Sequence, residues 1–200
     1  MRYFLSLPFL LTLVRVVMSP VFLIVYLYYE KIGLSFHSFP YVLLGILAIC
    51  ELTDFFDGFV ARKRNKVTDL GKILDPMADS IFRLSVFFTL TQGVIQLPLI
   101  VALVFFFRDS IISSLRTLCA LKGVTLAARL SGKIKAVVQA VTAFFILILI
   151  LPYTWGTLSL ESLRQMSYYA TYIAALYTVI SGGEYIWANW IYIKKTLERI

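Results

Sequence analysis

The sequence is poor in the residues that carry most covalent and redox chemistry. Among 200 residues there is one histidine, His37, and there are two cysteines, Cys50 and Cys119. A single histidine excludes a pair of catalytic histidines within the chain, and no Ser-His-Asp or Cys-His constellation is available. Cys50 and Cys119 lie in apolar segments without metal-site spacing, so we expect inert buried thiols. We expect His37 to be solvated in a short linker.

Charge is also scarce, and its scarcity excludes an ordinary soluble domain. Only 15% of the residues are charged and 60% are hydrophobic, against about 45–50% apolar residues in average globular proteins. The N-terminus lacks a basic segment with a small-residue cleavage site, so we expect no cleavable signal peptide. The length suits one domain, and we expect residues 1–200 to form a single membrane domain.

Six apolar segments are long enough to cross a bilayer, whose core needs about 20 helical residues. Their approximate limits are residues 8–28, 39–61, 77–97, 98–118, 135–153 and 167–190. The sequence therefore predicts an all-α, integral membrane bundle of six transmembrane helices. The aromatic ends of these segments, which include Trp155, Trp187 and Trp190, are typical of anchors at the membrane surface.

Lysine and arginine are distributed unevenly between the two sides of this predicted bundle, whose net charge is +8. Lys31 and Arg164 fall on one side. The other side carries Arg2, Arg62, Lys63, Arg64, Lys66, Lys72, Lys122, Arg129, Lys133, Lys135, Lys194, Lys195 and Arg199. Because cytoplasmic loops are the basic ones, we expect both termini to face the cytoplasm from a cell inner or plasma membrane. These charges suit anionic head groups, and we expect no nucleic-acid partner because there is no soluble basic domain.

Four aspartates flank the connection between the second and third predicted spans. Asp54 and Asp57 are three residues apart, and Asp75 and Asp79 are four apart, so each pair lies on one face of a helix. Ionisable groups at a membrane boundary are costly and usually functional, and clustered carboxylates repel each other. One bound divalent cation, or two, is the simplest way to keep them ionised. Oxygen-only ligands favour Mg²⁺, with Mn²⁺ as the alternative.

The complete pattern is Asp54-x-x-Asp57-Gly58-x-x-Ala61-Arg62, then eight residues, then Gly71-x-x-x-Asp75-x-x-x-Asp79. It resembles the signature of the CDP-alcohol phosphatidyltransferases, integral membrane enzymes of phospholipid synthesis, at all eight fixed positions. The alternative is an acidic loop that closes a helical hairpin, but a match of this length and spacing is rarely accidental. The resemblance implies an active site that opens to the cytoplasmic leaflet.

Each residue of the motif has an expected role. Asp54, Asp57 and Asp75 would hold the metal. Asp79 would bind a second ion, take the proton of an attacking hydroxyl, or both. The residues expected against the CDP-lipid are Asp57, Gly58, Ala61, Arg62, Thr68 and Gly71. The resemblance implies the role of Thr68, which is equally well an ordinary loop hydroxyl. Pro76 suits the first turn of the third span.

Cations within or beside apolar runs predict a second site, for a phosphate group. Arg15 and Arg108 need partners there, and Arg116 follows Arg108 by eight residues, on the same helical face. The expected residues of this acceptor-phosphate site are Thr12, Arg15, Arg108, Arg116, Lys133 and Lys135. The alternative is that Arg108 only pairs with Asp109 and that the lysines only meet lipid head groups.

Further stretches resemble the phosphatidylglycerophosphate synthases, and the related cardiolipin synthases, of the same superfamily. They are Leu74 to Asp79, Pro8-x-x-x-Thr12-x-x-Arg15, Arg108-Asp109-x-x-Ile112-Ser113-x-Leu115-Arg116, Gly132-Lys133-x-Lys135 and Ser181-Gly182-x-x-Tyr185. Phe9 and Ser80 depart from the pattern, since many relatives have Asn after the proline and Lys after the last aspartate. Arg83, one turn beyond Asp79, is the residue that could replace this Lys.

The resemblance implies transfer of the phosphatidyl group from CDP-diacylglycerol to glycerol 3-phosphate. The acceptor oxygen would displace CMP directly, since the chain lacks the groups for a covalent intermediate. Phosphatidylglycerol, inositol phosphate and serine are alternative acceptors within the superfamily. A membrane cation transporter is the alternative from another class, but transporter sites lie near the bilayer midplane, and these acids cluster at one membrane face. The family often forms homodimers, so a homodimer is implied here.

Overall fold

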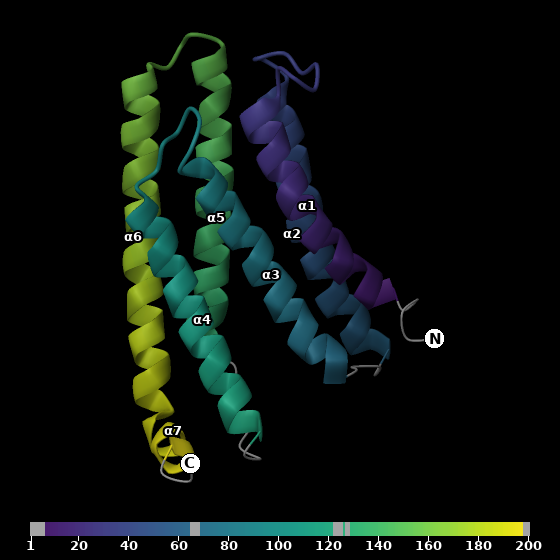
Figure 1. Cartoon of the computed structure of the whole chain (residues 1–200), viewed down its shortest axis with the longest axis vertical. Helices are drawn as coiled ribbons and strands as arrows, with labels where there is room; N and C mark the ends of the chain where they lie inside the picture. The colour runs from purple at the N-terminus through teal and green to yellow at the C-terminus, as the bar shows by residue number, and fades with distance from the viewer. Residues whose placement is uncertain (1–6, 65–68, 122–125, 127–128, 198–200) are drawn as a thin grey trace. The chain divides into compact units, whose positions relative to one another are not determined.

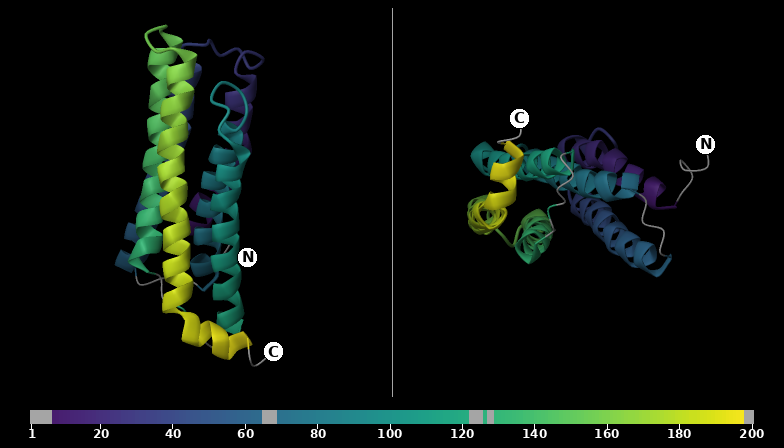
Figure 2. Two further views of the ribbon diagram at one scale, coloured as in Figure 1. Left: turned by 90° about the vertical axis from the view of Figure 1, so that its left-hand side faces the viewer. Right: turned by 90° about the horizontal axis from the view of Figure 1, so that it is seen from below.

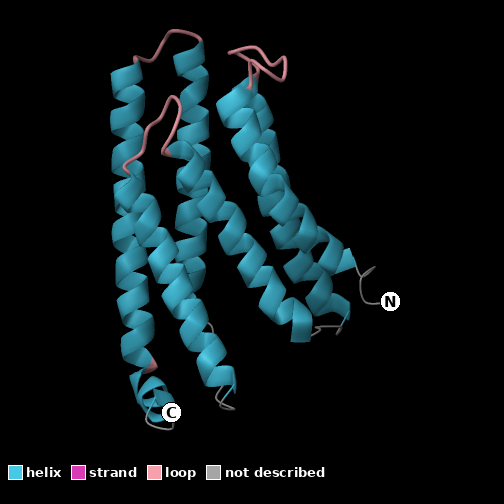
Figure 3. Ribbon diagram, viewed as in Figure 1, coloured by secondary structure: helices cyan, strands magenta, loops and turns pink. Residues whose placement is uncertain are grey.

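The computed structural model describes the backbone of residues 7–64, 69–121, 126 and 129–197, and the side chains of these residues except 7–11, 54–64, 69–76 and 195–197. This described part is helical and has no strands (Figures 1 and 3). The helices are α1 (Leu7–Tyr28), α2 (Phe39–Arg64), α3 (Asp69–Leu90), α4 (Leu99–Leu121), α5 (Leu130–Thr154), α6 (Leu160–Ala188) and α7 (Trp190–Leu197). They belong to a first unit, Met1–Leu97 with Ala143–Ser167, and a second unit, Pro98–Thr142 with Tyr168–Ile200.

Each of the six predicted spans corresponds to one helix, from α1 to α6, so the all-α class is confirmed. Among the described residues, one helix is long and apolar enough to cross a membrane, Leu130–Thr154. The apolar parts of α1 and α2 are shorter, Thr12–Tyr28 and Phe39–Thr53. The number of membrane crossings therefore stays a prediction. The short helix α7 follows α6, beyond the last predicted span, and the hydropathy pattern does not predict it.

The third helix differs from its predicted limits of 77–97. It begins at Asp69 and ends at Leu90, so Pro76 lies in its interior and the prediction of a first-turn proline is wrong. Hydropathy places the start too late because the first residues of α3 are polar and charged. It places the end too late because the apolar residues Val94, Ile95 and Leu97 extend the hydrophobic segment, although the helix has ended and the chain turns there. That turn has positive φ at Gly93 (64°) and Gln96 (55°), a backbone conformation that ends helices.

The core of the first unit is built by α1, which packs against both α2 and α3. Phe22 of α1 and Phe82 of α3 are buried and meet edge to face, with ring centroids 6.4 Å apart. Val86 continues the buried stripe of α3 at helical spacing. The same stripes, followed toward the other end of the helices, carry Arg15 on α1 and Asp79 on α3. Apolar packing therefore brings these two charged residues face to face.

The opposite end of this helix pair is fixed by Tyr26 of α1. Its hydroxyl donates a hydrogen bond to the carbonyl oxygen of Gln92 (3.2 Å) and accepts one from the amide of Ile95 (3.1 Å). A Cβ atom at Gly93 would lie 2.8 Å from the Tyr26 ring, and the φ of Gly93 is positive. Only glycine meets both conditions without strain. The turn after α3 is thus tied to α1 by a tyrosine that reaches its backbone.

The second unit consists of α4, the start of α5, most of α6, and α7. Asn189 separates α6 from α7; its side-chain nitrogen donates to the carbonyl oxygen of Tyr185 at 2.8 Å. Beyond this break α7 turns across the end of α6 and packs against α4 (Figure 2). Ile193 of α7 is buried. The buried face of α6 is polar, with Thr178, Ser181 and Tyr185 at helical spacing, so it suits contacts with charged groups of α4 and α5.

Candidate active site

The predicted aspartate pairs lie on consecutive helices of the first unit. Asp54 and Asp57 belong to the last turns of α2, whereas Asp75 and Asp79 belong to α3, so both spacings are helical as predicted. The four-residue connection 65–68 keeps the end of α2 near the start of α3. Of the four aspartates, Asp79 has a described side chain. The side-chain surroundings of Asp54, Asp57, Gly58, Ala61, Arg62, Gly71 and Asp75 lie outside the described part, and Thr68 lies outside the described residues altogether.

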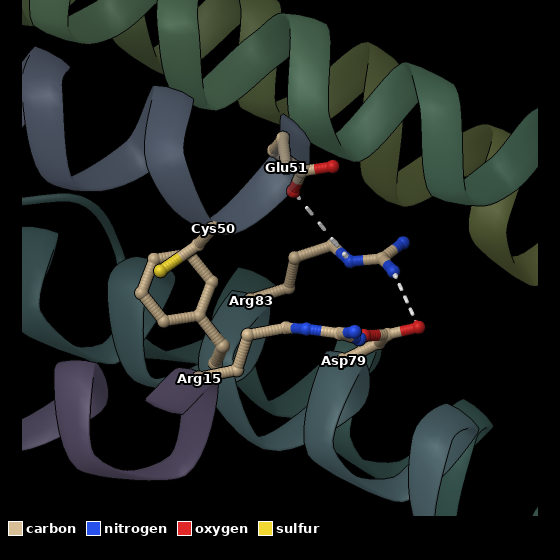
Figure 4. A pocket seen from close by; sticks show the side chains of 6 residues that line it. Arg15, Cys50, Glu51, Asp79 and Arg83 are labelled. Atoms are coloured by element: carbon tan, nitrogen blue, oxygen red, sulfur yellow. Dashed lines mark hydrogen bonds and ion pairs between the residues drawn. The ribbon is translucent and has the colours of Figure 1, made fainter. Parts of the chain in front are cut away.

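Asp79 lies between two arginines in a pocket of the first unit (Figure 4). Arg15 Nη1 donates a hydrogen bond to Asp79 Oδ1, and Arg83 Nη2 lies 3.7 Å from Asp79 Oδ2. Arg83 Nε in turn lies 3.9 Å from Oε1 of Glu51 on α2. These side chains come from three helices and alternate in charge in the order Arg15, Asp79, Arg83 and Glu51. We call these four residues the Asp79 row. Cys50 and Phe82 complete the lining of the pocket.

The pairing of Arg15 follows from its burial. Its side chain is 2% exposed, and a buried cation without a counter-ion costs several kcal/mol. Asp79 supplies that counter-ion, so the expectation that Arg15 needs a partner inside an apolar run is confirmed. Thr12, also buried, lies one turn earlier on α1. Through Arg15, a helix outside the aspartate motif contributes directly to the surroundings of Asp79.

The second unit holds another aspartate between two cations. Asp109 of α4 accepts hydrogen bonds from Lys135 Nζ at both carboxylate oxygens, at 2.8 and 2.9 Å. Its Oδ1 also lies 3.0 Å from Arg108 Nη1. We call Arg108, Asp109 and Lys135 the Asp109 cluster. All three side chains are largely buried, with exposed fractions of 13%, 9% and 7%, so their charges are weakly screened by solvent. The pairing of Arg108 with Asp109 is confirmed, and Lys135 joins it.

Two glycines make room for Arg108. A Cβ atom at Gly182 of α6 would lie 3.1 Å from Arg108 Cγ, and one at Gly132 of α5 would lie 3.7 Å from Arg108 Nη2. Arg108 Nε is buried and has no hydrogen-bond acceptor in the described part of the chain. A buried donor without an acceptor is unfavourable. The arginine therefore retains hydrogen-bonding capacity toward a bound group.

Arg116, two turns along α4, also reaches α6. Its Nε donates a hydrogen bond to the hydroxyl oxygen of Tyr185 at 3.0 Å. Since Arg108 contacts Gly182 and Arg116 contacts Tyr185, both arginines face the same neighbouring helix, as their spacing predicts. Lys133, by contrast, is exposed. The structure thus groups Arg108 and Lys135 closely, and holds Arg116 against α6.

Comparison with known proteins identifies the family of the chain. The protein-family model described as CDP-alcohol phosphatidyltransferase matches residues 5–191. The chain belongs to the CDP-alcohol phosphatidyltransferase family. Similar curated proteins carry the name CDP-diacylglycerol–glycerol-3-phosphate 3-phosphatidyltransferase. One from Bacillus subtilis (strain 168) is 31% identical over 195 residues, covering 94% of this chain and 97% of the relative. One from Wigglesworthia glossinidia brevipalpis is 37% identical over 149 residues, covering 72% and 77%.

CDP-alcohol phosphatidyltransferases are membrane enzymes that generally use divalent metal ions. Within the described side chains no three His, Cys, Asp or Glu residues converge on one point, but three of the four motif carboxylates lie outside that set. The donor chemistry fits a hard divalent ion, because all four motif aspartates offer carboxylate oxygens. Asp79, the aspartate of the motif whose side chain is described, has one oxygen toward Arg15 and the other toward Arg83.

Glu51 and Arg83 are charged residues of this pocket that are neither in the motif nor among the predicted site residues. The signal for Arg83 is its position four residues after Asp79, which places both on one face of α3. The signal for Glu51 is its position three residues before Asp54 on α2. The remaining expectations about reactive side chains are confirmed: Cys50 and Cys119 are free and buried, and His37 is exposed. Glu184 pairs with Arg129 at 3.6 Å on the surface of the second unit.

Proposed function

We propose that this protein transfers the phosphatidyl group from CDP-diacylglycerol to sn-glycerol 3-phosphate, giving phosphatidylglycerophosphate and CMP. The similar proteins are named for this reaction and cover nearly the whole chain. The observation that carries the choice of acceptor is the Asp109 cluster. Two buried cations lie beside one aspartate there, and the buried Nε of Arg108 has no acceptor in the described part of the chain. An acceptor without a phosphate would not need these cations. Membership of an enzyme family argues against the alternative of a cation transporter.

We propose that Asp54, Asp57, Asp75 and Asp79 hold two Mg²⁺ ions, with Mn²⁺ as the alternative metal. The bound ions would offset negative charge on the pyrophosphate oxygens in the transition state. The motif residues proposed to hold the CDP-lipid are Asp57, Gly58, Ala61, Arg62, Thr68 and Gly71. Glycine and alanine on that helix face allow the nucleotide to approach the backbone closely.

In this mechanism Asp79 acts on the acceptor. The hydroxyl of glycerol 3-phosphate gives its proton to the Asp79 carboxylate as its oxygen attacks the β-phosphorus, which carries the diacylglycerol. The new phosphorus–oxygen bond forms while the bond to CMP breaks, and CMP leaves with the electron pair. The chain supplies no nucleophile–histidine pair for a covalent intermediate. Arg15, buried against Asp79, keeps a cation beside the reacting carboxylate.

The acceptor phosphate carries roughly two negative charges at neutral pH, by analogy with phosphorylated side chains. Such an anion approaches a pyrophosphate that is itself anionic, so cations must offset the repulsion. Arginine binds phosphate through two parallel hydrogen bonds, whereas lysine acts as a point charge. Arg108, with its buried Nε, is therefore the first proposed ligand, and Lys135 supports it. The further proposed residues of this site are Thr12, Arg15, Arg116 and Lys133.

We propose that residues 1–200 form a single domain with six membrane crossings in a cell inner or plasma membrane. Both termini and the aspartate motif would face the cytoplasm. The proposed assembly is a homodimer. Contacts within the first unit support this topology. Arg164 Nε donates to the carbonyl oxygen of Val94 at 2.9 Å, and the rings of Phe36 and Tyr153 are 5.7 Å apart. Loops predicted on the poorly basic side thus lie together at one end.

An acceptor screen with purified protein in detergent tests the proposal. CMP release from CDP-diacylglycerol in the presence of Mg²⁺ should depend on glycerol 3-phosphate. Glycerol is the matched control, since it differs from the acceptor by its phosphate, and inositol phosphate, serine and phosphatidylglycerol cover the other acceptors of the superfamily. Equal rates with glycerol and glycerol 3-phosphate would contradict a phosphate pocket. Faster release with another acceptor would reassign the alcohol.

A further inference from the structure

We infer that Arg83, oriented by Glu51, is a positioning residue for Asp79 in the transfer reaction. The inference rests on the proposed function of Asp79 and adds two residues to its surroundings. Neither residue belongs to the aspartate motif. Both lie in the first unit, where three helices contribute to the Asp79 row.

The two oxygens of the Asp79 carboxylate face different cations. Oδ1 accepts a hydrogen bond from Arg15, whereas Oδ2 lies 3.7 Å from Arg83 Nη2. The second distance is an ion-pair distance and is longer than a hydrogen bond. Arg83 therefore attracts one oxygen by charge without a direct hydrogen bond to it. Because the two arginines lie at different oxygens, each contributes to the orientation of the carboxylate.

Arg83 is itself held at its other end. Its Nε lies 3.9 Å from Glu51 Oε1 while Nη2 faces Asp79. The guanidinium group is planar and rigid, so an interaction at Nε fixes the direction of Nη2. The Arg83 and Glu51 side chains are 12% and 23% exposed, so solvent screens the pair incompletely. A lysine in place of Arg83 could carry the charge but could not serve both carboxylates in this way.

The Glu51–Arg83 pair also joins the two helices of the aspartate motif. Glu51 precedes Asp54 by three residues on α2, and Arg83 follows Asp79 by four residues on α3. The pair therefore links the helix that carries Asp54 and Asp57 to the helix that carries Asp75 and Asp79.

The test compares Arg83→Met, Arg83→Lys and Glu51→Gln with the wild type in detergent. Arg83→Met should lower kcat roughly ten- to a hundredfold, the usual effect of losing a group that orients a ligand residue. The KM of each substrate, and the affinity for CDP-diacylglycerol measured by calorimetric titration with Mg²⁺, should stay within about twofold, because Arg83 contacts Asp79 rather than substrate. Arg83→Lys should lie between the wild type and Arg83→Met. Glu51→Gln should lower kcat less than Arg83→Met.

Arg164→Met is the matched control, because Arg164 is a part-buried arginine of the same unit that binds a loop carbonyl instead. It should leave kcat unchanged. The double variant Glu51→Gln/Arg83→Met should be no slower than Arg83→Met alone, since Glu51 acts through Arg83. Unchanged kcat in Arg83→Met, additive losses in the double variant, or a parallel loss of CDP-diacylglycerol affinity would overturn the inference.

Two measurements keep the outcome decisive. If Arg83→Met does not yield folded protein, judged by its thermal transition, Glu51→Gln and Arg83→Lys decide, because both conserve size and polarity. Asp79→Asn separates this inference from the proposed function. If Asp79→Asn turns over as fast as the wild type, the proposed role of Asp79 is wrong. If Asp79→Asn is slow but the Arg83 and Glu51 variants are as fast as the wild type, Asp79 keeps its role and the inference about Arg83 and Glu51 is wrong.

Discussion

The Asp79 row and the Asp109 cluster each hold an aspartate between two cations, but they differ in how the charges balance. In the row, Glu51 adds a second acid, so two arginines meet two carboxylates. In the cluster, Arg108 and Lys135 share Asp109. The contacts differ as well. Lys135 donates to both oxygens of Asp109 at hydrogen-bond distance, whereas Arg83 stays 3.7 Å from Asp79.

This difference assigns different tasks to similar residues. An aspartate that lies at ion-pair distance from Arg83, rather than at hydrogen-bond distance, suits a group that exchanges contacts during a reaction, either with a proton or with a metal. Two buried cations beside one hydrogen-bonded acid suit a fixed binding site for an anion. Reaction rate should thus depend on the row, and acceptor affinity should depend on the cluster. The predictions below test this division.

The largest effect is expected from removing a proposed metal ligand beside the row. Asp57→Asn and Asp75→Asn each delete one ligand charge while conserving size. Because transition-state charge held by a metal is worth several kcal/mol, turnover should be lost while the protein stays folded. CMP release should be measured across a Mg²⁺ titration, with the thermal transition in detergent as the control for folding. Wild-type activity in either variant at any Mg²⁺ concentration would contradict the metal assignment.

Much of the fold and the motif could be predicted from the sequence because both depend on local spacing. The lengths of the apolar segments predict the helices α1 to α6, and the intervals of three and four residues place Asp54 with Asp57, and Asp75 with Asp79, on one helical face each. The limits of α3 could not be predicted from hydropathy. The helix begins with a polar turn, and apolar residues such as Val94 and Ile95 continue after it ends, so hydropathy places both limits too late.

Contacts between helices were the part that local spacing could not provide. That Arg15 requires a partner follows from its apolar surroundings, but the choice of Asp79, 64 residues away in the sequence, depends on the packing of α1 against α3. Glu51 likewise gains its role only when α2 and α3 are in register. For Asp109, the sequence suggests Arg108 as a neighbour, whereas Lys135 is brought in by the folding of α5 onto α4.

The next effect compares the same substitution in the two regions. Asp79→Asn should lower kcat by about 10² to 10⁴-fold, the range for loss of a general base, and should leave the affinity for CDP-diacylglycerol nearly unchanged. Asp109→Asn should instead raise the KM for glycerol 3-phosphate, because Arg108 and Lys135 lose the acid that orients them, with a smaller change in kcat. Steady-state kinetics with each substrate varied in turn measures both. Loss of CDP-diacylglycerol binding in Asp79→Asn would mean that Asp79 is mainly a metal ligand. Equal losses of kcat in both variants would contradict the assignment of rate to the Asp79 row and of acceptor affinity to the Asp109 cluster.

A smaller effect is expected from Arg108→Lys, which keeps the charge of the cluster but loses the planar group. The KM for glycerol 3-phosphate should rise about tenfold, which corresponds to about 1.4 kcal/mol of binding free energy, because a lysine cannot bind phosphate through two parallel hydrogen bonds. The KM for CDP-diacylglycerol should stay near the wild-type value. The control substrate is glycerol, whose poor use should not change. An acceptor KM untouched in both Arg108→Lys and a Lys135→Met variant would assign the cluster to structure alone.

The smallest effect comes from a methyl group next to the cluster. In Gly182→Ala the new Cβ would lie 3.1 Å from Arg108 Cγ, and the adjacent Gly183 offers a matched control, since a Cβ there has nothing within 4 Å. The atom that must move belongs to a flexible side chain, so the guanidinium shifts by a few tenths of an ångström rather than being expelled. Both alanines should stabilise the helix by up to about 1 kcal/mol through their intrinsic propensity. A change in KM that occurs in one variant alone is therefore not an effect of helix stability.

We expect the KM for glycerol 3-phosphate to rise about two- to threefold in Gly182→Ala, on the order of 0.5 kcal/mol, and to stay constant in Gly183→Ala. The same change in both variants would mean that the effect arises from the backbone of α6, and no change in Gly182→Ala would mean that the position of Arg108 does not control acceptor affinity.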